Sequence, residues 1–205
     1  MEEKKEWWKD KGNLIFIGIL IAAFVIRFYF FILTRNQPLW WDESELMLRA
    51  KGMVFGTPIT GWNIARELVF PFLISLILRI GLGELTIRFL QVLLSTFTIF
   101  MLYMVSKEMF NKKIALIASF LMSFLWLHLF FTNRILLYIW PCLIYLLIIF
   151  FFWKGYVKKE RKLYLYLFAI SASLGLQIYF STAFLLAGIF IFIIITERIS
   201  FLKNK

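Results

Sequence analysis

Three carboxylates stand close together in a chain that has only 12 acidic residues. They are Asp42, Glu43 and Glu45, within the stretch QPLWWDESELMLRAKGMVFG that runs from Gln37 to Gly56. Aspartate and glutamate are among the side chains that accept or deliver a proton in a reaction. A group of them directly behind two tryptophans therefore marks this stretch as a candidate catalytic site.

The residues that follow these carboxylates predict the element that positions them. Apolar residues recur there at helical spacing, at Leu46, Ala50, Met53 and Val54. This pattern predicts a short amphipathic helix that lies on a membrane surface and ends at Gly52 or Gly56. Trp40 and Trp41 would anchor the start of this helix at the membrane interface.

The carboxylates also have a structural explanation. An aspartate at the start of a helix, with a glutamate three residues later, fits a variant of the capping box, with Asp42 as N-cap and Glu45 at N3. Glu43 would be favoured by the positive end of the helix dipole. Because neighbouring helical residues point about 100° apart, Asp42 and Glu43 cannot both face one substrate atom. The spacing leaves capping and catalysis open, and it gives the two residues different roles.

The composition indicates a membrane protein. Hydrophobic residues make up 62% of the chain and the mean hydropathy is +0.83, whereas soluble domains are about half apolar. We predict an all-α, polytopic transmembrane helix bundle, because helices satisfy their own backbone hydrogen bonds in lipid. Runs of about 20 apolar residues cross a bilayer. They predict about six spans, at Leu14–Leu33, Thr86–Ser106, Ile114–Phe131, Ile135–Trp153, Leu163–Phe180 and Thr182–Thr196.

The distribution of charge orients these spans. Most of the 23 Lys and Arg residues fall on one side under this topology, which places them and the amino terminus in the cytoplasm. Residues 34–85 then form one long outer loop that carries the Asp-Glu motif, and Leu68–Ile80, interrupted by Pro71, is expected to be a juxtamembrane helix. The net charge of +11 reflects this topology and contact with anionic membrane lipids, so nucleic acid is not expected as a partner.

With the loop placed outside, the sequence resembles a known family. LWWDESELMLRAKGMVFG, an aromatic residue followed by Asp-Glu and an amphipathic stretch ending in glycine, resembles the first outer loop of the GT-C superfamily of membrane glycosyltransferases. The likeness is greatest to the glycosyltransferase family 39-like branch, which contains protein O-mannosyltransferases and lipid A aminoarabinose transferases. The stretch ELTIRFLQVLLSTFTIFMLYMVSKEMFNKKIALIASFLMSF resembles the next two spans of that family.

The resemblance implies an inverting transfer of a sugar from a polyprenyl- or dolichyl-phosphate donor to an acceptor on the outer face. In that family the aspartate of the pair, here Asp42, is the general base, with Glu43 beside it. The lipid phosphate that leaves needs cations, and the arginine fork matches phosphate oxygens. The outer candidates are Arg66, Arg88 and Arg134. A divalent cation stays open as a cofactor, although no residue spacing predicts a metal site.

Each arginine also has a structural explanation. Arg88 and Arg134 stand at span ends, where arginine commonly reaches toward lipid headgroups. Arg66 stands beside Glu67 and would pair with it. His128, alone in the third predicted span, is expected to be a packed or lipid-interface residue rather than a ligand.

Two departures from the family pattern leave a second interpretation open. The region TNRILLYIWPC has no carboxylate where members often carry a second outer acidic residue, and members are commonly much longer. The alternative is a non-catalytic, truncated relative that acts as a lipid-binding or accessory membrane subunit. We expect one membrane domain over residues 1–205 that resembles the amino-terminal half of these enzymes. A second chain that supplies the carboxy-terminal half is then a candidate partner.

The predicted topology can be tested directly. We expect Lys112 and Lys159 to lie in the cytoplasm and Trp62 to lie on the outer side. Cysteines placed singly at these positions in a Cys142→Ser background should react with a membrane-impermeant maleimide in intact cells only at position 62. Labelling of position 62 that required permeabilisation would reverse the orientation.

Overall fold

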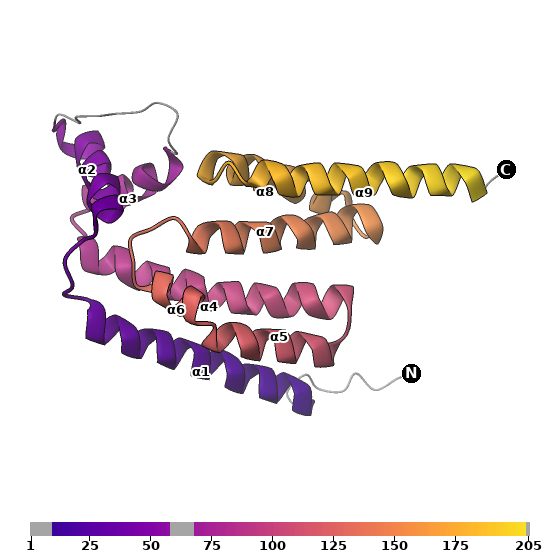
Figure 1. The fold of residues 1–205 in the computed structure, drawn as a ribbon, viewed down its shortest axis with the longest axis horizontal. Helices are drawn as coiled ribbons and strands as arrows, with labels where there is room; N and C mark the ends of the chain where they lie inside the picture. The colour runs from indigo at the N-terminus through magenta and orange to yellow at the C-terminus, as the bar shows by residue number, and fades with distance from the viewer. Residues whose placement is uncertain (1–9, 58–67, 204–205) are drawn as a thin grey trace.

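The chain folds into helices, as the sequence predicted. A computed structural model describes residues 10–57 and 68–203, with side chains described up to Glu197. These residues form nine α-helices and one π-helix, η2, and contain no strand (Figure 1). The helices are α1 (Lys11–Thr34), α2 (Trp41–Phe55), α3 (Val69–Arg79), α4 (Glu84–Met109), α5 (Lys112–Phe124), α6 (Trp126–Thr132), α7 (Ile139–Phe152), η2 (Trp153–Val157), α8 (Lys162–Ile178) and α9 (Thr182–Lys203).

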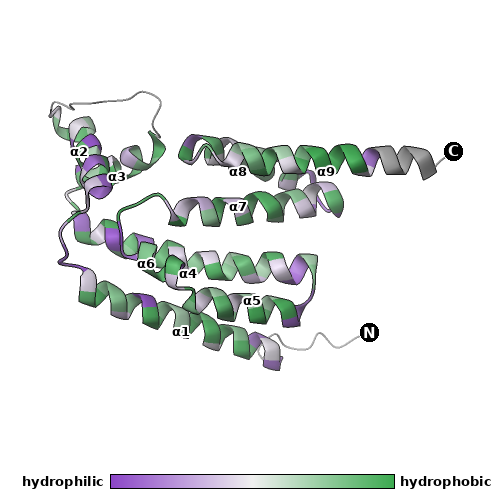
Figure 2. Ribbon diagram, viewed as in Figure 1, coloured by the Kyte–Doolittle hydropathy of each residue, from purple (hydrophilic) through white to green (hydrophobic). Residues whose placement is uncertain are grey.

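The long helices lie side by side, with α4 in the middle of the bundle. α4 packs against α1, α5 and α7, and α7 packs in turn against α8 (Figure 1). α2 and α3 pack against each other at one end of the bundle, which we call the α2 end. Hydrophobic residues follow the lengths of the long helices, whereas hydrophilic residues gather on α2 and near helix ends (Figure 2). This distribution is that of an integral, multi-pass membrane protein.

The structure corrects the predicted number of spans. Among the described residues, three helices are long and apolar enough to cross a membrane, namely α1, α4 and the Ile139–Val157 stretch of α7 and η2. α5 and α6 make a fourth if the bent pair counts as one span. The prediction of about six is therefore wrong by this measure of length and composition. α8 has 17 residues and rises about 25 Å, less than the hydrocarbon core of about 30 Å. The stretch of α9 with described side chains, Thr182–Glu197, is likewise not counted as a span.

Two predicted spans differ from the helices that form. The predicted span Ile114–Phe131 is broken at Leu125, whose backbone is extended (φ −61°, ψ 111°), and α5 and α6 meet there at 57°. The predicted span Ile135–Trp153 begins as a helix only at Ile139. Residues 133–138 instead connect α6 to α7 without a helix, and this connection carries Arg134 to the α2 end.

Helices form in both short segments for which helices beside the membrane were predicted. α3 falls within the predicted segment and has apolar residues both inside and outside, since Ile74 is buried while Phe72 is exposed. α2 ends at Gly56 and not at Gly52. Gly56 takes the left-handed conformation (φ +67°) that side chains other than glycine rarely adopt.

A shared apolar core seats α2 on the bundle. It joins α2 and α3 to α4 and to the connection between α6 and α7, and its buried residues are Met47, Ala50, Phe70, Ile74, Ile87 and Ile135. Met47 lies one helical turn after Glu43, so both side chains project from the same face of α2. Burial of this face therefore carries Glu43 into the protein.

Candidate active site

Glu43 lies at the centre of the candidate site and is completely buried, with 0% of its surface exposed. Its Oε2 accepts a hydrogen bond of 2.8 Å from the backbone N–H of Trp40, and its Oε1 accepts one of 2.6 Å from the N–H of Ile135. The Nη1 of Arg134 lies 3.5 Å from Oε2, and the Nη2 of Arg88 lies 4.0 Å from Oε1. One carboxylate thus ties the start of α2 to the connection between α6 and α7.

The predicted capping arrangement is wrong in its register. α2 begins at Trp41, so Trp40 is the N-cap and Glu43 occupies N3, where its carboxylate receives the N-cap N–H. Asp42 is therefore not the cap, and Glu45 pairs along the helix with Arg49 at 2.5 Å. The tertiary contacts explain the difference, because Glu43 gains the Ile135 N–H and two arginines in this register.

Asp42 has the opposite environment from its neighbour. Its side chain is exposed in the first turn of α2. Within the described part of the chain, its carboxylate forms neither an ion pair nor a hydrogen bond with another side chain. The first turn of α2 thus presents one free carboxylate to the surface and buries the next one.

Arg88 is buried, with 1% of its surface exposed, and does not reach out toward headgroups. Its Nε and Nη2 contact Glu84 Oε1 at 2.9 and 2.7 Å. Its Nη1 donates to the carbonyl of Asn133 at 2.9 Å, and its Nη2 donates to the carbonyl of Gln37 at 3.2 Å. Arg88 therefore joins the start of α4 to the chain before α2 and to the chain after α6.

Arg134 is held between aromatic rings and a carboxylate. Its guanidinium carbon lies 3.9 Å from the centre of the Trp40 ring and 5.7 Å from that of Phe130, a geometry that favours a cation over an aromatic face. Glu43 lies at its other side, at 3.5 Å. Trp40 thus covers the guanidinium of Arg134, a contact that the sequence analysis did not predict.

Gln91 fixes the backbone that carries Arg134, and the sequence analysis missed it. Its Nε2 donates to the carbonyls of Arg134 and Leu136 at 3.2 and 2.9 Å, and its Oε1 accepts from Trp140 Nε1 at 3.0 Å. Carbonyls outside a helix need such partners when they lie away from water. The sequence did contain a signal for Gln91, namely a polar amide side chain within the apolar run that forms α4.

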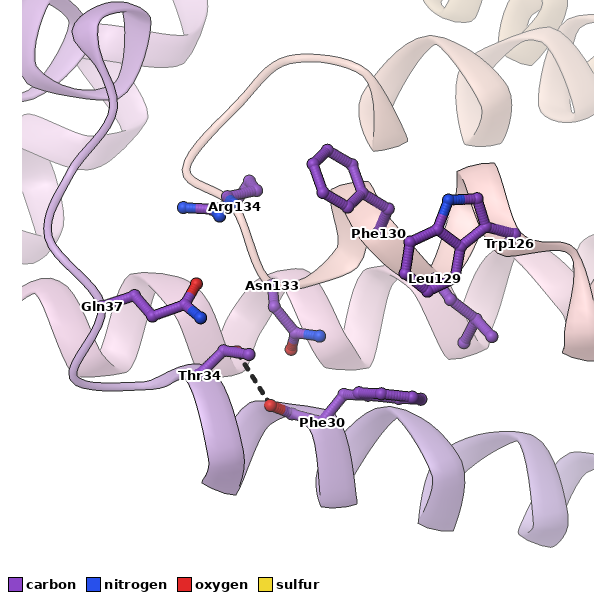
Figure 3. Close-up of a pocket in the computed structure, with 8 residues that line it drawn as sticks. All are labelled: Phe30, Thr34, Gln37, Trp126, Leu129, Phe130, Asn133 and Arg134. Carbon is purple, nitrogen blue, oxygen red and sulfur yellow. Dashed lines mark hydrogen bonds between the residues drawn. The ribbon is translucent and has the colours of Figure 1, made fainter.

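A pocket of about 220 Å³ opens beside Arg134, and we call it the Arg134 pocket. It is lined by Phe30, Thr34, Gln37, Trp126, Leu129, Phe130, Asn133 and Arg134. Figure 3 shows the α6 side chains on one side, the polar groups Gln37, Asn133 and Arg134 on the other, and the α1 residues below. The Oδ1 atom of Asn133 is buried and has no hydrogen-bond partner. The pocket therefore offers a cation and an apolar wall.

The remaining predicted residue, Arg66, and its neighbour Glu67 lie outside the described residues. The structure brings Glu43, Arg88 and Arg134 together and leaves Asp42 exposed on the same helical turn as Glu43. In the described ranges, no three side chains among His, Cys, Asp and Glu gather into a group that could hold a metal ion.

A bundle of apolar helices with a carboxylate and arginines at one end is the architecture expected of a membrane glycosyltransferase of the GT-C class. The model of the dolichyl-phosphate-mannose-protein mannosyltransferase family matches residues 65–205, more than half of the chain. The chain belongs to this family, whose members use a sugar donor linked to dolichyl or polyprenyl phosphate. The family assignment predicted from the sequence is confirmed. No curated protein and no solved structure matches the chain.

The matched residues cover only part of the site. They include Arg88, Gln91, Asn133 and Arg134, whereas the Asp-Glu pair precedes residue 65. Family membership therefore rests on the bundle and on the arginine-bearing elements, and the contacts of Glu43 connect the Asp-Glu pair to them.

The buried carboxylate gives a stability prediction. Glu43→Gln should lower the free energy of unfolding by about 3 kcal/mol, because it leaves buried arginine charge without its partner. Asp42→Asn makes the same chemical change at the neighbouring exposed position and should be nearly neutral. Thermal unfolding of both variants in the same detergent measures the difference. Equal stability of the two variants would contradict the role of Glu43 in holding α2.

Proposed function

We propose that the chain is a glycosyltransferase module that transfers a sugar from a polyprenyl- or dolichyl-phosphate donor to a hydroxyl acceptor at the outer face of a membrane. The observation that carries the proposal is the difference in burial and pairing between the two carboxylates in the first turn of α2. Glu43 is buried and holds α2 against Arg134, while Asp42 stays exposed and unpaired among the described side chains. An unpaired carboxylate on a fixed helix is suited to accept a proton from an acceptor.

The Arg134 pocket suits the junction between a lipid chain and its phosphate. Its polar part holds the Arg134 guanidinium, and its apolar part is made by Phe30, Trp126 and Leu129. A polyprenyl phosphate has the same order of polarity, with an anion followed by isoprene units. We assign the pocket to the donor phosphate and to the first units of its chain.

Of the three arginines predicted to bind phosphate, the structure describes Arg88 and Arg134. These two would have different roles at the phosphate. Arg134 lines the pocket, so its fork can contact phosphate oxygens and stabilise the charge that develops as the phosphate leaves. Arg88 already donates to Gln37 and Asn133, two residues of the same pocket. It would act on the phosphate by its positive charge and by fixing these two residues.

The proposed reaction is a single displacement. The acceptor oxygen bonds to the anomeric carbon as the bond from that carbon to the phosphate oxygen breaks on the opposite side, which inverts the configuration. The bonding electrons leave with the lipid phosphate, and Asp42 takes the proton of the acceptor hydroxyl. The name of the family specifies mannose and a protein acceptor, so a mannosyl donor and a protein hydroxyl are the first substrates to test.

A non-catalytic function is the second candidate, as a lipid-binding or accessory subunit. It is favoured by one observation, namely that Asp42 is absent from the residues that line the Arg134 pocket. Under this alternative the chain binds polyprenyl phosphate and assists a partner chain that performs the transfer. The two candidates differ in what replacement of Asp42 does.

Asp42→Asn should abolish most transfer while leaving lipid binding intact. The amide cannot accept a proton at neutral pH, and general-base assistance is worth about 10²–10⁴ in rate. Transfer from radiolabelled dolichyl-phosphate mannose is measured in membranes of the cells that make the protein, so that any partner chain is present. Binding of undecaprenyl phosphate is measured separately on the full chain in nanodiscs.

Ser44→Ala, an exposed change in the same helical turn, is the matched control and should retain full transfer. Full transfer activity of the Asp42→Asn variant would show that Asp42 is not the general base. Unchanged lipid binding together with unchanged transfer in that variant would favour the accessory function.

A further inference from the structure

Arg27 carries a positive charge in the interior of the bundle, with 0% of its surface exposed. No carboxylate among the described residues forms an ion pair with it. Its five N–H donors are nevertheless all used. They bond to Ser95 Oγ at 2.7 Å, the Ala23 carbonyl at 3.0 Å, the Ser123 carbonyl at 3.2 Å, the Met122 carbonyl at 3.4 Å and His128 Nδ1 at 3.0 Å.

Two of these acceptors belong to the broken end of α5. The last carbonyls of a helix have no partner within the helix, and α5 ends at Phe124, directly after Met122 and Ser123. Arg27 supplies donors to both carbonyls, and its charge also suits the negative end of the helix dipole. Without such donors, these carbonyls would be unsatisfied in an apolar interior.

The local sequence gives only a weak reason for α5 to end there. The break lies within Ser123-Phe124-Leu125-Trp126, which contains neither glycine nor proline. Ser119 and Ser123 donate back to the carbonyls of Ala115 and Ser119, which slightly weakens and bends a helix. A sharp bend also arises where another side chain enters the hydrogen-bond ladder, and the guanidinium of Arg27, from α1, bonds to the last carbonyls of α5.

The same guanidinium also holds α6. Arginine only donates hydrogen bonds, so His128 Nδ1 is the acceptor and the proton of its neutral ring lies on Nε2. Thr132, one turn further along α6, bonds to Ser95 Oγ at 2.7 Å and donates to the His128 carbonyl at 2.7 Å. One face of α6 is thereby fixed to Arg27 and to its partner Ser95.

We propose that Arg27 is a positioning residue: it imposes the break between α5 and α6 and so sets the position of the Arg134 pocket. Asn133 and Arg134 directly follow α6, so the direction of α6 decides where they lie. Phe30 and Leu129, two other pocket residues, are close neighbours of Arg27 and His128 along their helices. The consequence for donor binding rests on the proposed function, whereas the break itself does not.

Backbone conformation at Leu125 provides a test that is independent of activity. The sequence Leu-Trp occurs twice, at Leu39–Trp40 and Leu125–Trp126. Full-length protein with ¹³C-carbonyl leucine and ¹⁵N tryptophan therefore gives two carbonyl signals in solid-state NMR spectra recorded in bilayers. In the wild type, the Leu125 signal should have the shift of extended backbone, and Leu39, which lies outside the helices, provides a reference signal.

Arg27→Met should move the Leu125 signal to the helical range, as α5 and α6 fuse, while the Leu39 signal stays in place. Arg27→Lys should retain the extended shift, because its ammonium group can still bond the two carbonyls. Arg35→Met removes the same charge from the exposed end of α1 and should change neither signal. An extended Leu125 in Arg27→Met protein would overturn the proposal.

A second variant decides the matter if Arg27→Met does not fold. Trp126→Pro puts proline at the first position of α6, where proline is favoured, after a residue that is already extended. The double variant Arg27→Met/Trp126→Pro thus encodes the break in the local sequence. Leucine precedes proline nowhere in the natural chain, so ¹⁵N proline in place of ¹⁵N tryptophan selects the Leu125 carbonyl of the double variant.

Recovery of folded double variant with an extended Leu125 signal would support the proposal. Failure of the double variant to fold would overturn it, because Arg27 would then be needed for more than the break.

Binding of undecaprenyl phosphate in nanodiscs tests the consequence for the pocket. Arg27→Met should weaken binding by about tenfold or more, as expected when a charged hydrogen bond to the ligand is lost, and Arg27→Lys and Arg35→Met should bind nearly as the wild type does. If Arg27→Met loses the break but binds the lipid unchanged, Arg27 is still the cause of the break. The Arg134 pocket would then not be the phosphate site of the proposed function.

Discussion

The buried carboxylate of Glu43 is the interaction on which the candidate site depends. It receives the backbone N–H groups of Trp40 and Ile135, which belong to segments far apart in the sequence, and it lies beside Arg134. A carboxylate in an apolar interior is stable only when its oxygens are hydrogen-bonded and its charge is compensated. This requirement fixes α2 against the connection between α6 and α7, and it leaves Asp42 at the surface.

Both ends of α6 are held by buried arginines from other helices. Arg27 of α1 reaches His128 and the end of α5, and Arg88 of α4 reaches the carbonyl of Asn133 just after α6. Each arginine bonds to two backbone carbonyls outside the interior of a helix, Arg27 to those of Met122 and Ser123 and Arg88 to those of Gln37 and Asn133. These carbonyls need donors where water is excluded. The short α6 is therefore a rigid bridge between the centre of the bundle and the Arg134 pocket, although it has only seven residues.

Features encoded within one segment could be predicted from the sequence. The all-α fold, the helix α3, the end of α2 at one of two glycines and the family follow from apolar periodicity, glycine and short motifs. Features that depend on two segments could not. The carboxylate that caps α2 is selected by contacts with Ile135 and the arginines, and the end of α5 at Phe124 is bonded by Arg27 from α1, so neither feature could be read from its own segment alone. The number of spans was overestimated because apolar content was counted without knowing where helices end.

The contact between Arg27 and the end of α5 has a consequence for the order of assembly in the membrane. Residues 112–132 are apolar enough, taken together, to pass as one span. Because we propose that Arg27 imposes the bend, we expect the bend to form when α1 docks and brings its guanidinium to the carbonyls of α5. It follows that the pocket is a late product of helix association in lipid, absent from the inserted but unassembled helices.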